Sequence, residues 1–233
     1  KLGYQTTIHL FPEGDYNEQE LSESMKTKPA AKIILTKTNS QNDPLYNFMF
    51  LPDTNREKYL PTRLTSGQIM KLENVNMDSD ISIKIFQDKK NTGKLNDYAM
   101  QGADTEAGVN RVMTESENIF RSNEYQKNKY RYGFSMEGQG TSGIMMHLMQ
   151  GLVTVFPSMN SGKASSDRFI QSTRTSVENT PAYAMIITGD NSRSSQVRSG
   201  MLYSKLILTA HQLGLTAQPL SQVLEEYPEM KNP

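Results

Sequence analysis

The sequence has no cysteine, no tryptophan and no excess of charge of either sign. Without cysteine the chain cannot form disulfides, thiolate nucleophiles or zinc–thiolate sites, although this leaves the redox state of its compartment open. Lysine plus arginine and aspartate plus glutamate number 25 each, so no global field attracts nucleic acid or an anionic membrane. No apolar run approaches the roughly 20 residues of a membrane helix, and no signal peptide is visible. We therefore expect no nucleic-acid partner, no membrane span and a cytoplasmic location.

Hydrophobic periodicity predicts a mixture of strands and helices. The expected strands cover residues 5–11, 80–86 and 182–188, the last of them buried, while 31–36 reads either as a strand or as the end of a helix. The expected helices cover residues 65–74, 104–122, 143–156 and 195–213, with 143–156 as a core helix. Thr65 or Ser66 is suited to cap the first of these helices, and Gly214 to end the last. Strands and helices mix without strict alternation, which favours an α+β fold.

A glycine-rich segment, Gly138-x-Gly140-x-x-Gly143, matches the letters of the dinucleotide-binding fingerprint. A true fingerprint follows a strand and has an acidic residue about 20 positions downstream for the ribose. The nearest downstream acid, Asp167, lies too far along the chain. The simpler interpretation is a flexible loop that enters the apolar helix, with Thr141 or Ser142 as its cap.

Residues 125–132 interleave basic and aromatic side chains, a composition that suits stacking on RNA. The alternative is an amphipathic surface whose tyrosines cover the core. The zero net charge favours this alternative.

The three histidines, His9, His147 and His211, show no metal-ligand spacing and no Ser-His-Asp order. His147 lies inside the apolar run 143–156, so we expect a buried core histidine there. The sequence therefore predicts no metal site and no nucleophilic triad.

One segment combines a hydroxyl residue, a spacer and a basic residue, and a helix start follows shortly afterwards. It reads Asp53-Thr54-Asn55-Arg56-Glu57-Lys58-Tyr59 and continues as Leu64-Thr65-Ser66-Gly67-Gln68-Ile69. A short hydroxyl and backbone amides can bind phosphate, while an arginine fork can bind phosphate or a carbonyl edge. The alternative is a loop that carries a surface arginine.

A second segment runs from the strand at 182–188 through the helix at 195–213 into a proline-containing loop. Its end reads Leu208-Thr209-Ala210-His211-Gln212-Leu213-Gly214-Leu215-Thr216-Ala217-Gln218-Pro219-Leu220-Ser221-Gln222. The alternative to a functional loop is a simple helix-ending loop, since caps of this kind are common.

Together the two segments resemble the nitroreductase superfamily, in particular its two-lobed, FMN-binding, Acg-like branch. The resemblance spans most of residues 1–226, with a looser match over 90–180. It implies a nitroreductase-like α+β fold with a central, mainly antiparallel sheet and packed helices. It also implies that residues 1–35 are the remnant of a first lobe, that 36–233 form the second lobe, and that sequence before Lys1 belongs to the same protein.

The resemblance further implies FMN as the cofactor and NAD(P)H as the hydride donor for two-electron reduction of a quinone-type or nitro-type small-molecule acceptor. In the family, backbone amides of the loop after the helix bind flavin N5 and O4. These positions fall on Ser221 and Gln222, beside Pro219 and Leu220. Thr54, Asn55 and Arg56 would serve the phosphate or pyrimidine side. The quaternary arrangement implied is a homodimer or an intrachain pseudo-dimer with a first lobe.

The chain departs from the family in several places. Pro52 stands where classical members have an arginine, and the family's Gln-Pro-Trp segment is absent. The usual basic phosphate ligands of the C-terminal strand would follow Pro233. A non-catalytic flavin-binding or flavin-sequestering protein is therefore the alternative to an enzyme, and a lobe that serves only as a dimerisation or lid module is a third hypothesis.

Overall fold

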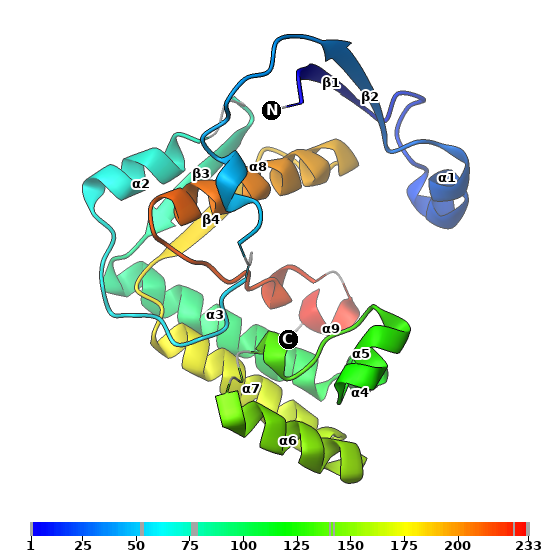
Figure 1. Ribbon diagram of the computed structural model, residues 1–233, viewed down its shortest axis with the longest axis vertical. Helices are drawn as coiled ribbons and strands as arrows, with labels where there is room; N and C mark the ends of the chain where they lie inside the picture. The colour runs from blue at the N-terminus through cyan, green and yellow to red at the C-terminus, as the bar shows by residue number, and fades with distance from the viewer. Residues whose placement is uncertain are drawn as a thin grey trace. The chain divides into compact units, whose positions relative to one another are not determined.

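The computed structural model describes residues 2–51, 54–75, 79–139, 141, 143–225 and 227–231. They form two compact units, each assembled from segments that are distant in sequence. Unit 1 comprises residues 1–52, 65–85 and 184–216, and unit 2 comprises residues 53–64, 86–183 and 217–233. The fold is α+β and mostly helical (Figure 1).

Unit 1 contains an antiparallel ribbon of β1 (Tyr4–Leu10) and β2 (Ala31–Lys37). The register places Ile8 opposite Ile33, so that apolar residues of both strands share one face. This confirms the strand at 5–11 and decides in favour of a strand at 31–36. Between the strands lie the 3-10 helix η1 (Glu18–Glu20) and the helix α1 (Leu21–Thr27).

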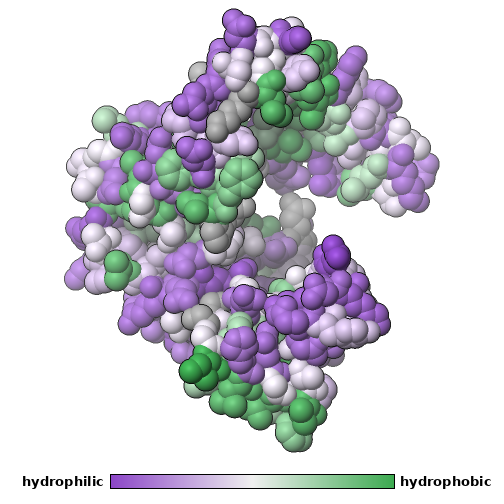
Figure 2. All heavy atoms as spheres, in the orientation of Figure 1, coloured by the Kyte–Doolittle hydropathy of each residue, from purple (hydrophilic) through white to green (hydrophobic). Residues whose placement is uncertain are grey.

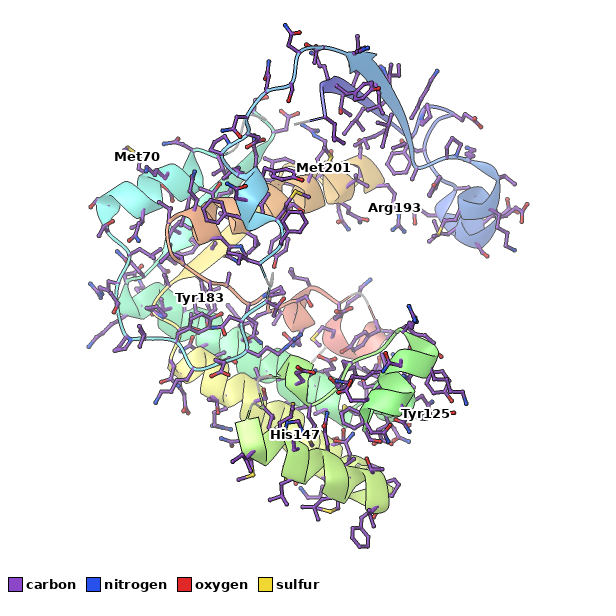
Figure 3. The ribbon with its side chains drawn as sticks, in the orientation of Figure 1. Met70, Tyr125, His147, Tyr183, Arg193 and Met201 are labelled. Carbon is purple, nitrogen blue, oxygen red and sulfur yellow. The ribbon has the colours of Figure 1, made fainter. Side chains whose placement is uncertain are left out.

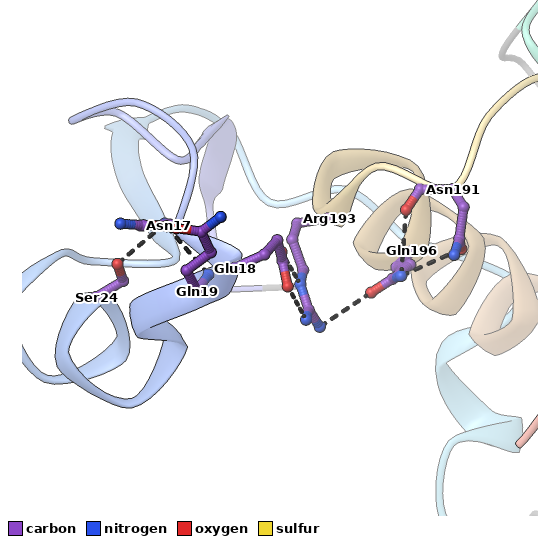
Figure 4. Close-up of polar contacts among 7 residues, drawn as sticks. All are labelled: Asn17, Glu18, Gln19, Ser24, Asn191, Arg193 and Gln196. Carbon is purple, nitrogen blue, oxygen red and sulfur yellow. Dashed lines mark hydrogen bonds and ion pairs between the residues drawn. The ribbon is translucent and has the colours of Figure 1, made fainter. Parts of the chain in front are cut away.

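The remainder of unit 1 is built around α8 (Arg193–Gln212), which contacts α2 (Ser66–Glu73) and the 3-10 helix η2 (Tyr46–Phe48). The α2 helix begins with a complete capping box. The backbone N–H of Gln68 donates to the Thr65 hydroxyl oxygen, and the backbone N–H of Thr65 donates to Gln68 Oε1. Arg193 at the start of α8 binds both carboxylate oxygens of Glu18 at 2.7 Å, which lowers the pKa of Glu18 (Figure 4).

The second sheet pairs β3 (Ile81–Phe86) with β4 (Tyr183–Thr188). The predicted central sheet is wrong for the described residues, which form two separate two-stranded antiparallel sheets. In β3 the alternation holds, since Ile81 and Ile83 are buried and their neighbours are exposed. The expectation of a buried strand at 182–188 is wrong, because Met185 and Ile187 are about two-fifths exposed. Met185 and Ile187 point to the same face of the sheet, and that face is only partly covered.

Unit 2 is helical around α3 (Lys89–Gly108), which packs chiefly against α7 (Lys163–Glu178). The buried positions of both helices are mostly small, which lets their backbones approach closely. Tyr183 donates a hydrogen bond to Asn96 Oδ1 at 2.6 Å and lies beside α3 (Figure 3). Further elements of this unit are α4 (Asn110–Ile119), α5 (Glu124–Tyr130), η3 (Glu137–Gln139), α6 (Gly143–Val155), η4 (Pro157–Asn160), η5 (Gln222–Leu224) and α9 (Pro228–Lys231).

The predicted single helix at 104–122 is in fact two helices. Val109 has extended backbone angles (φ −89°, ψ 96°), so it ends α3 and serves as the N-cap of α4. Its side chain is buried, and its β-branched shape favours this conformation over a helical one.

The α6 helix forms where the apolar run predicts it, but the expectation of a core helix is wrong. Only Met146, Gln150 and Val153 are buried, and Met146 and Val153 join a small cluster with Met136. His147 is exposed, which also corrects the expected buried histidine (Figure 3). The run of apolar letters has no period, so it specified hydrophobicity without indicating which face a neighbour covers.

Candidate functional site

The two segments that carry the family resemblance meet in unit 2. The backbone N–H of Asn55 donates a hydrogen bond to the carbonyl oxygen of Ala217, with a nitrogen–oxygen distance of 2.8 Å. These residues are separated by most of the chain, so local sequence preference cannot account for the contact. The contact places the polar segment at 54–56 directly beside the loop that leads to residues 219–222.

In the first segment, the three candidate residues have different roles. The side chain of Asn55 is used locally, because its Oδ1 accepts the N–H of Glu57 at 3.2 Å and shapes a turn. Its carbonyl accepts the hydroxyl of Tyr59 at 3.0 Å. Arg56 is exposed, and one guanidinium nitrogen donates to the carbonyl of Gly138 at 2.7 Å. Thr54 is half-buried, while Pro52 and Asp53 lie outside the described residues.

The glycine-rich segment at 138–143 therefore has a structural partner in Arg56. It leads from η3 into α6, and the described residues before it form an isolated bridge, Phe120 to Phe134, and no strand. A dinucleotide fingerprint needs a strand at that point. The structure matches the simpler interpretation of a loop that enters the helix, with Gly140 and Ser142 outside the described residues.

The α8 helix ends as the sequence predicts. Gly214 has a φ of +71°, its N–H donates to the carbonyl of His211 at 3.0 Å, and the N–H of Leu215 donates to Ala210 at 2.9 Å. This pair of bonds is a Schellman motif, which requires a left-handed residue and so favours glycine. In unit 2, the chain that follows is held by Gln218, whose Oε1 accepts the hydroxyl of Ser176 at 3.1 Å.

The candidate loop itself forms η5, with Ser221 as its N-cap. It rests on α3 at Gly102, where an added Cβ would lie 2.9 Å from Val223 Cγ1 and 3.2 Å from both Gln222 Cβ and the Val223 amide nitrogen. Gly102 is buried, and its lack of a side chain creates the space that the loop occupies. Sequence reasoning missed Gly102, although a glycine in a helical segment is a recognised sign of close packing.

The polar groups around η5 are unevenly satisfied. Gln222 Oε1 and the Tyr227 hydroxyl are buried, and neither has a hydrogen-bond partner among the residues that the structure describes. Burial, with a smaller contribution from Glu225, raises the pKa of Glu106. Burial and nearby carboxylates likewise raise the pKa of the Tyr227 hydroxyl. Of the residues predicted from the sequence, Arg56 is the one that carries positive charge, while Arg111 lies 5.2 Å from the centroid of the Tyr227 ring.

Pro219 and Ser221 are exposed, and Leu220 and Gln222 are half-buried, so the loop presents a mixed surface. Elsewhere in unit 2 there is a separate cavity of about 300 Å³. Its lining includes Glu117, Phe120, Ser122, Val153, Thr154 and Asn160, and it contains none of the residues predicted from the sequence.

Residues 125–132 do not cover the core with their tyrosines, contrary to expectation. Tyr125, Tyr130 and Tyr132 are exposed, and the buried guanidinium of Arg121 lies 4.6 and 4.7 Å from the ring centroids of Tyr130 and Tyr132. Such cation–π contacts stabilise the turn after α5. The aromatic side chains of this segment therefore take part in intramolecular contacts that stabilise it.

No protein family model, curated protein or solved structure matches the chain. Within the part of the chain that the structure describes, no helix is both long enough and apolar enough to span a bilayer.

Proposed function

We propose that unit 2 binds FMN and takes part in NAD(P)H-dependent two-electron reduction of a quinone-type or nitro-type acceptor, as in the nitroreductase superfamily. The observation that supports this proposal is the 2.8 Å hydrogen bond from Asn55 to Ala217. This bond joins the two segments whose residues resemble the family. Two loops that resembled the family by chance alone would have no reason to be in contact.

Arg56 is the group suited to the phosphate or to a flavin carbonyl edge. One of its nitrogens is held by the Gly138 carbonyl at 2.7 Å, which orients the guanidinium, and its other donors bind no further residue that the structure describes. Because the guanidinium is exposed, it can reach a ligand at the surface of unit 2. A charged, bidentate donor is the common solution for phosphate recognition. Asn55 contributes by position, since its N–H binds Ala217 and its carbonyl and side chain are engaged within the segment, which holds residues 54–56 beside the loop.

The loop at 219–222 suits the N5 and O4 side. The amides of Ser221 and Gln222 lie at the start of η5, where backbone donors have no partner within the turn. Within the described part of the chain the buried Gln222 Oε1 is an acceptor without a donor, and the N3–H of a flavin ring is a donor of the matching kind. Buried polar groups are nearly always paired, so an orphaned acceptor favours a site that a ligand completes.

When bound, FMN would supply the redox chemistry, and this chain would supply orientation and electrostatics. Ser221 and Gln222 would hold the ring edge through their backbone, and the packing of η5 on Gly102 would keep these amides in place. Arg56 would balance negative charge at the opposite end. This division of work explains a sequence without a Ser-His-Asp arrangement or cysteine.

The test of cofactor binding is a titration of FMN fluorescence with the purified chain, using Arg56→Ala and, as a matched control, Arg63→Ala. Arg63 is an exposed arginine of the same segment, residues 53–64. Loss of a charge-assisted hydrogen bond should weaken FMN binding about 10-fold to 100-fold in Arg56→Ala. The control should bind as the wild type does, and equal affinity of all three proteins would remove Arg56 from the site.

A second variant, Gln222→Met, separates a ligand role from a structural one. It keeps the length of the side chain and removes the unpaired Oε1, which should stabilise the free protein. If the oxygen also accepts from FMN, the same variant should bind FMN more weakly. Greater stability with unchanged FMN affinity would contradict the assignment.

Turnover distinguishes the enzyme from a flavin-sequestering protein, which is the second hypothesis. The FMN-loaded protein is mixed with NADPH and a quinone or nitroaromatic acceptor, and NADPH absorbance is followed. Binding of FMN without oxidation of NADPH would establish the non-catalytic role.

A further inference from the structure

The α6 helix of unit 2 presents a broad apolar face to solvent. Ile144, Leu148, Gly151 and Val155 follow one another at intervals of four, three and four residues, so they form one stripe along the helix. The exposed fractions are 89% for Ile144, 57% for Leu148 and 68% for Val155. The opposite face carries the buried residues of this helix, Met146, Gln150 and Val153. Figure 2 shows hydrophobic side chains gathered over this helix.

The patch extends beyond the stripe. Met145, Phe156 and Met159 flank it with exposed fractions of 59%, 55% and 38%. With about 170 Å² for each fully exposed large side chain, the patch offers on the order of 600 Å² of apolar surface. That area lies at the upper end of what monomeric proteins expose, and it approaches the roughly 800 Å² that each partner buries in a standard interface.

The charge pattern around α6 narrows the kind of partner. Residues 138–162 contain no Asp, Glu, Lys or Arg. Helices that lie on anionic membranes carry lysine and arginine beside their apolar face, so this segment lacks the usual electrostatic attraction to lipid. In a two-fold symmetric interface the same surface patch of both copies comes together. A patch with charge of one sign would therefore repel the identical patch of the second copy. An uncharged apolar patch meets no such repulsion.

Gly151 lies in the middle of the stripe and is suited to the point where two helices cross. A Cβ built there would meet no atom of the described residues within 4 Å. The distance between packed helices depends on the side chains at their contact, and glycine permits the closest approach. Ile144 and Val155 on either side would then pack against the partner helix.

We propose that the α6 face, defined as Ile144, Met145, Leu148, Gly151, Val155, Phe156 and Met159, binds the same face of a second copy of this chain in a two-fold symmetric dimer. The FMN site proposed above is not required for this contact, so either proposal can fail without the other. The interface rests on apolar burial, which is proportional to the area removed from water.

Sedimentation of the full chain over a series of concentrations tests the dimer. We expect a species of twice 26.3 kDa at high concentration. Leu148→Glu should raise the dimer dissociation constant about 100-fold or more, because an unpaired charge would be buried. Leu60→Glu, an equally drastic change at a 76% exposed leucine of unit 2, should leave the constant unchanged. A chain that is monomeric throughout, or a dimer insensitive to Leu148→Glu, would overturn the proposal.

The absence of cysteine permits a more direct test of geometry. Gly151→Cys should form an intermolecular disulfide under mild oxidation, because a two-fold axis near this position brings the two Cα atoms within about 7 Å. Leu60→Cys is the control and should stay uncoupled. Flotation with vesicles of neutral and anionic phospholipid is run in parallel. A monomer that floats with vesicles through α6 would refute the dimer and indicate a lipid surface.

Discussion

Replacing Gly102 with alanine should destabilise unit 2, although the same change elsewhere in α3 should stabilise it. Glycine in a helix interior is about 0.8–1 kcal/mol less favourable than alanine, so Gly102→Ala gains that much from the backbone. The new Cβ, however, would lie 2.9 Å from Val223 Cγ1 and 3.2 Å from the Val223 amide nitrogen. The side chain of Val223 can turn away, but its backbone can move only if η5 shifts. Overpacking of this kind costs about 1–3 kcal/mol, which leaves a net loss of up to about 2 kcal/mol.

Gly93 provides the matched control, since it lies in the same helix and an added Cβ there meets nothing within 4 Å. Gly93→Ala should therefore stabilise α3 by about 0.5–1 kcal/mol. The two variants carry the same chemical change, so unfolded-state effects largely cancel in their comparison. The expected difference between them is about 1–3 kcal/mol, with opposite signs relative to the wild type.

Hydrogen exchange of the α3 amides is the suitable assay, because it reports the local free energy of opening in a chain with two compact units. Protection should fall in Gly102→Ala and rise in Gly93→Ala. FMN affinity is a second measurement, and it should decrease only in Gly102→Ala if η5 forms part of the flavin site. Equal changes in protection for both variants would refute the close contact between α3 and η5.

Three further predictions concern stability. Gly133→Ala should destabilise unit 2 by about 2 kcal/mol or more in urea unfolding, because φ is +96° and the new Cβ would lie 1.9 Å from the carbonyl oxygen of Ile119; an unchanged midpoint would contradict this geometry. Thr65→Ala should cost about 1 kcal/mol through loss of the capping box, and Thr65→Ser should restore most of it, as measured by exchange of the first α2 amides. Burial raises the pKa of Tyr183 to about 12, above the roughly 10 of an unfolded tyrosine. The contribution of the neutral Tyr183 hydroxyl to the free energy of unfolding is therefore fully present below pH about 10. It is lost as pH rises from about 10 to about 12, by roughly 1 kcal/mol once partial exposure is discounted; urea unfolding across this range should show a shallower loss in Tyr183→Phe.

Local signals in the sequence predicted the features that depend on neighbouring residues alone. The cap at Thr65 and the left-handed Gly214 satisfy backbone groups within one turn of a helix, so their partners are a few residues away. Alternation likewise predicted the strand at 5–11, whereas the apolar run at 31–36 left a strand and a helix end both open. For the candidate site, the sequence identified residues 54–56 and 219–222 as two separate segments. It did not indicate that the side chain of Asn55 is engaged in a local turn.

Which segments meet, and which faces are covered, was decided by tertiary structure. The hydrogen bond from Asn55 to Ala217, the seat of η5 on Gly102 and the bond from Arg56 to Gly138 all join residues far apart in the chain. Such contacts depend on loop closure and packing, which residue periodicity does not encode. The exposed face of α6 has the same origin. An apolar run specifies that surface is available for burial, and only the arrangement of neighbours determines whether this chain buries it.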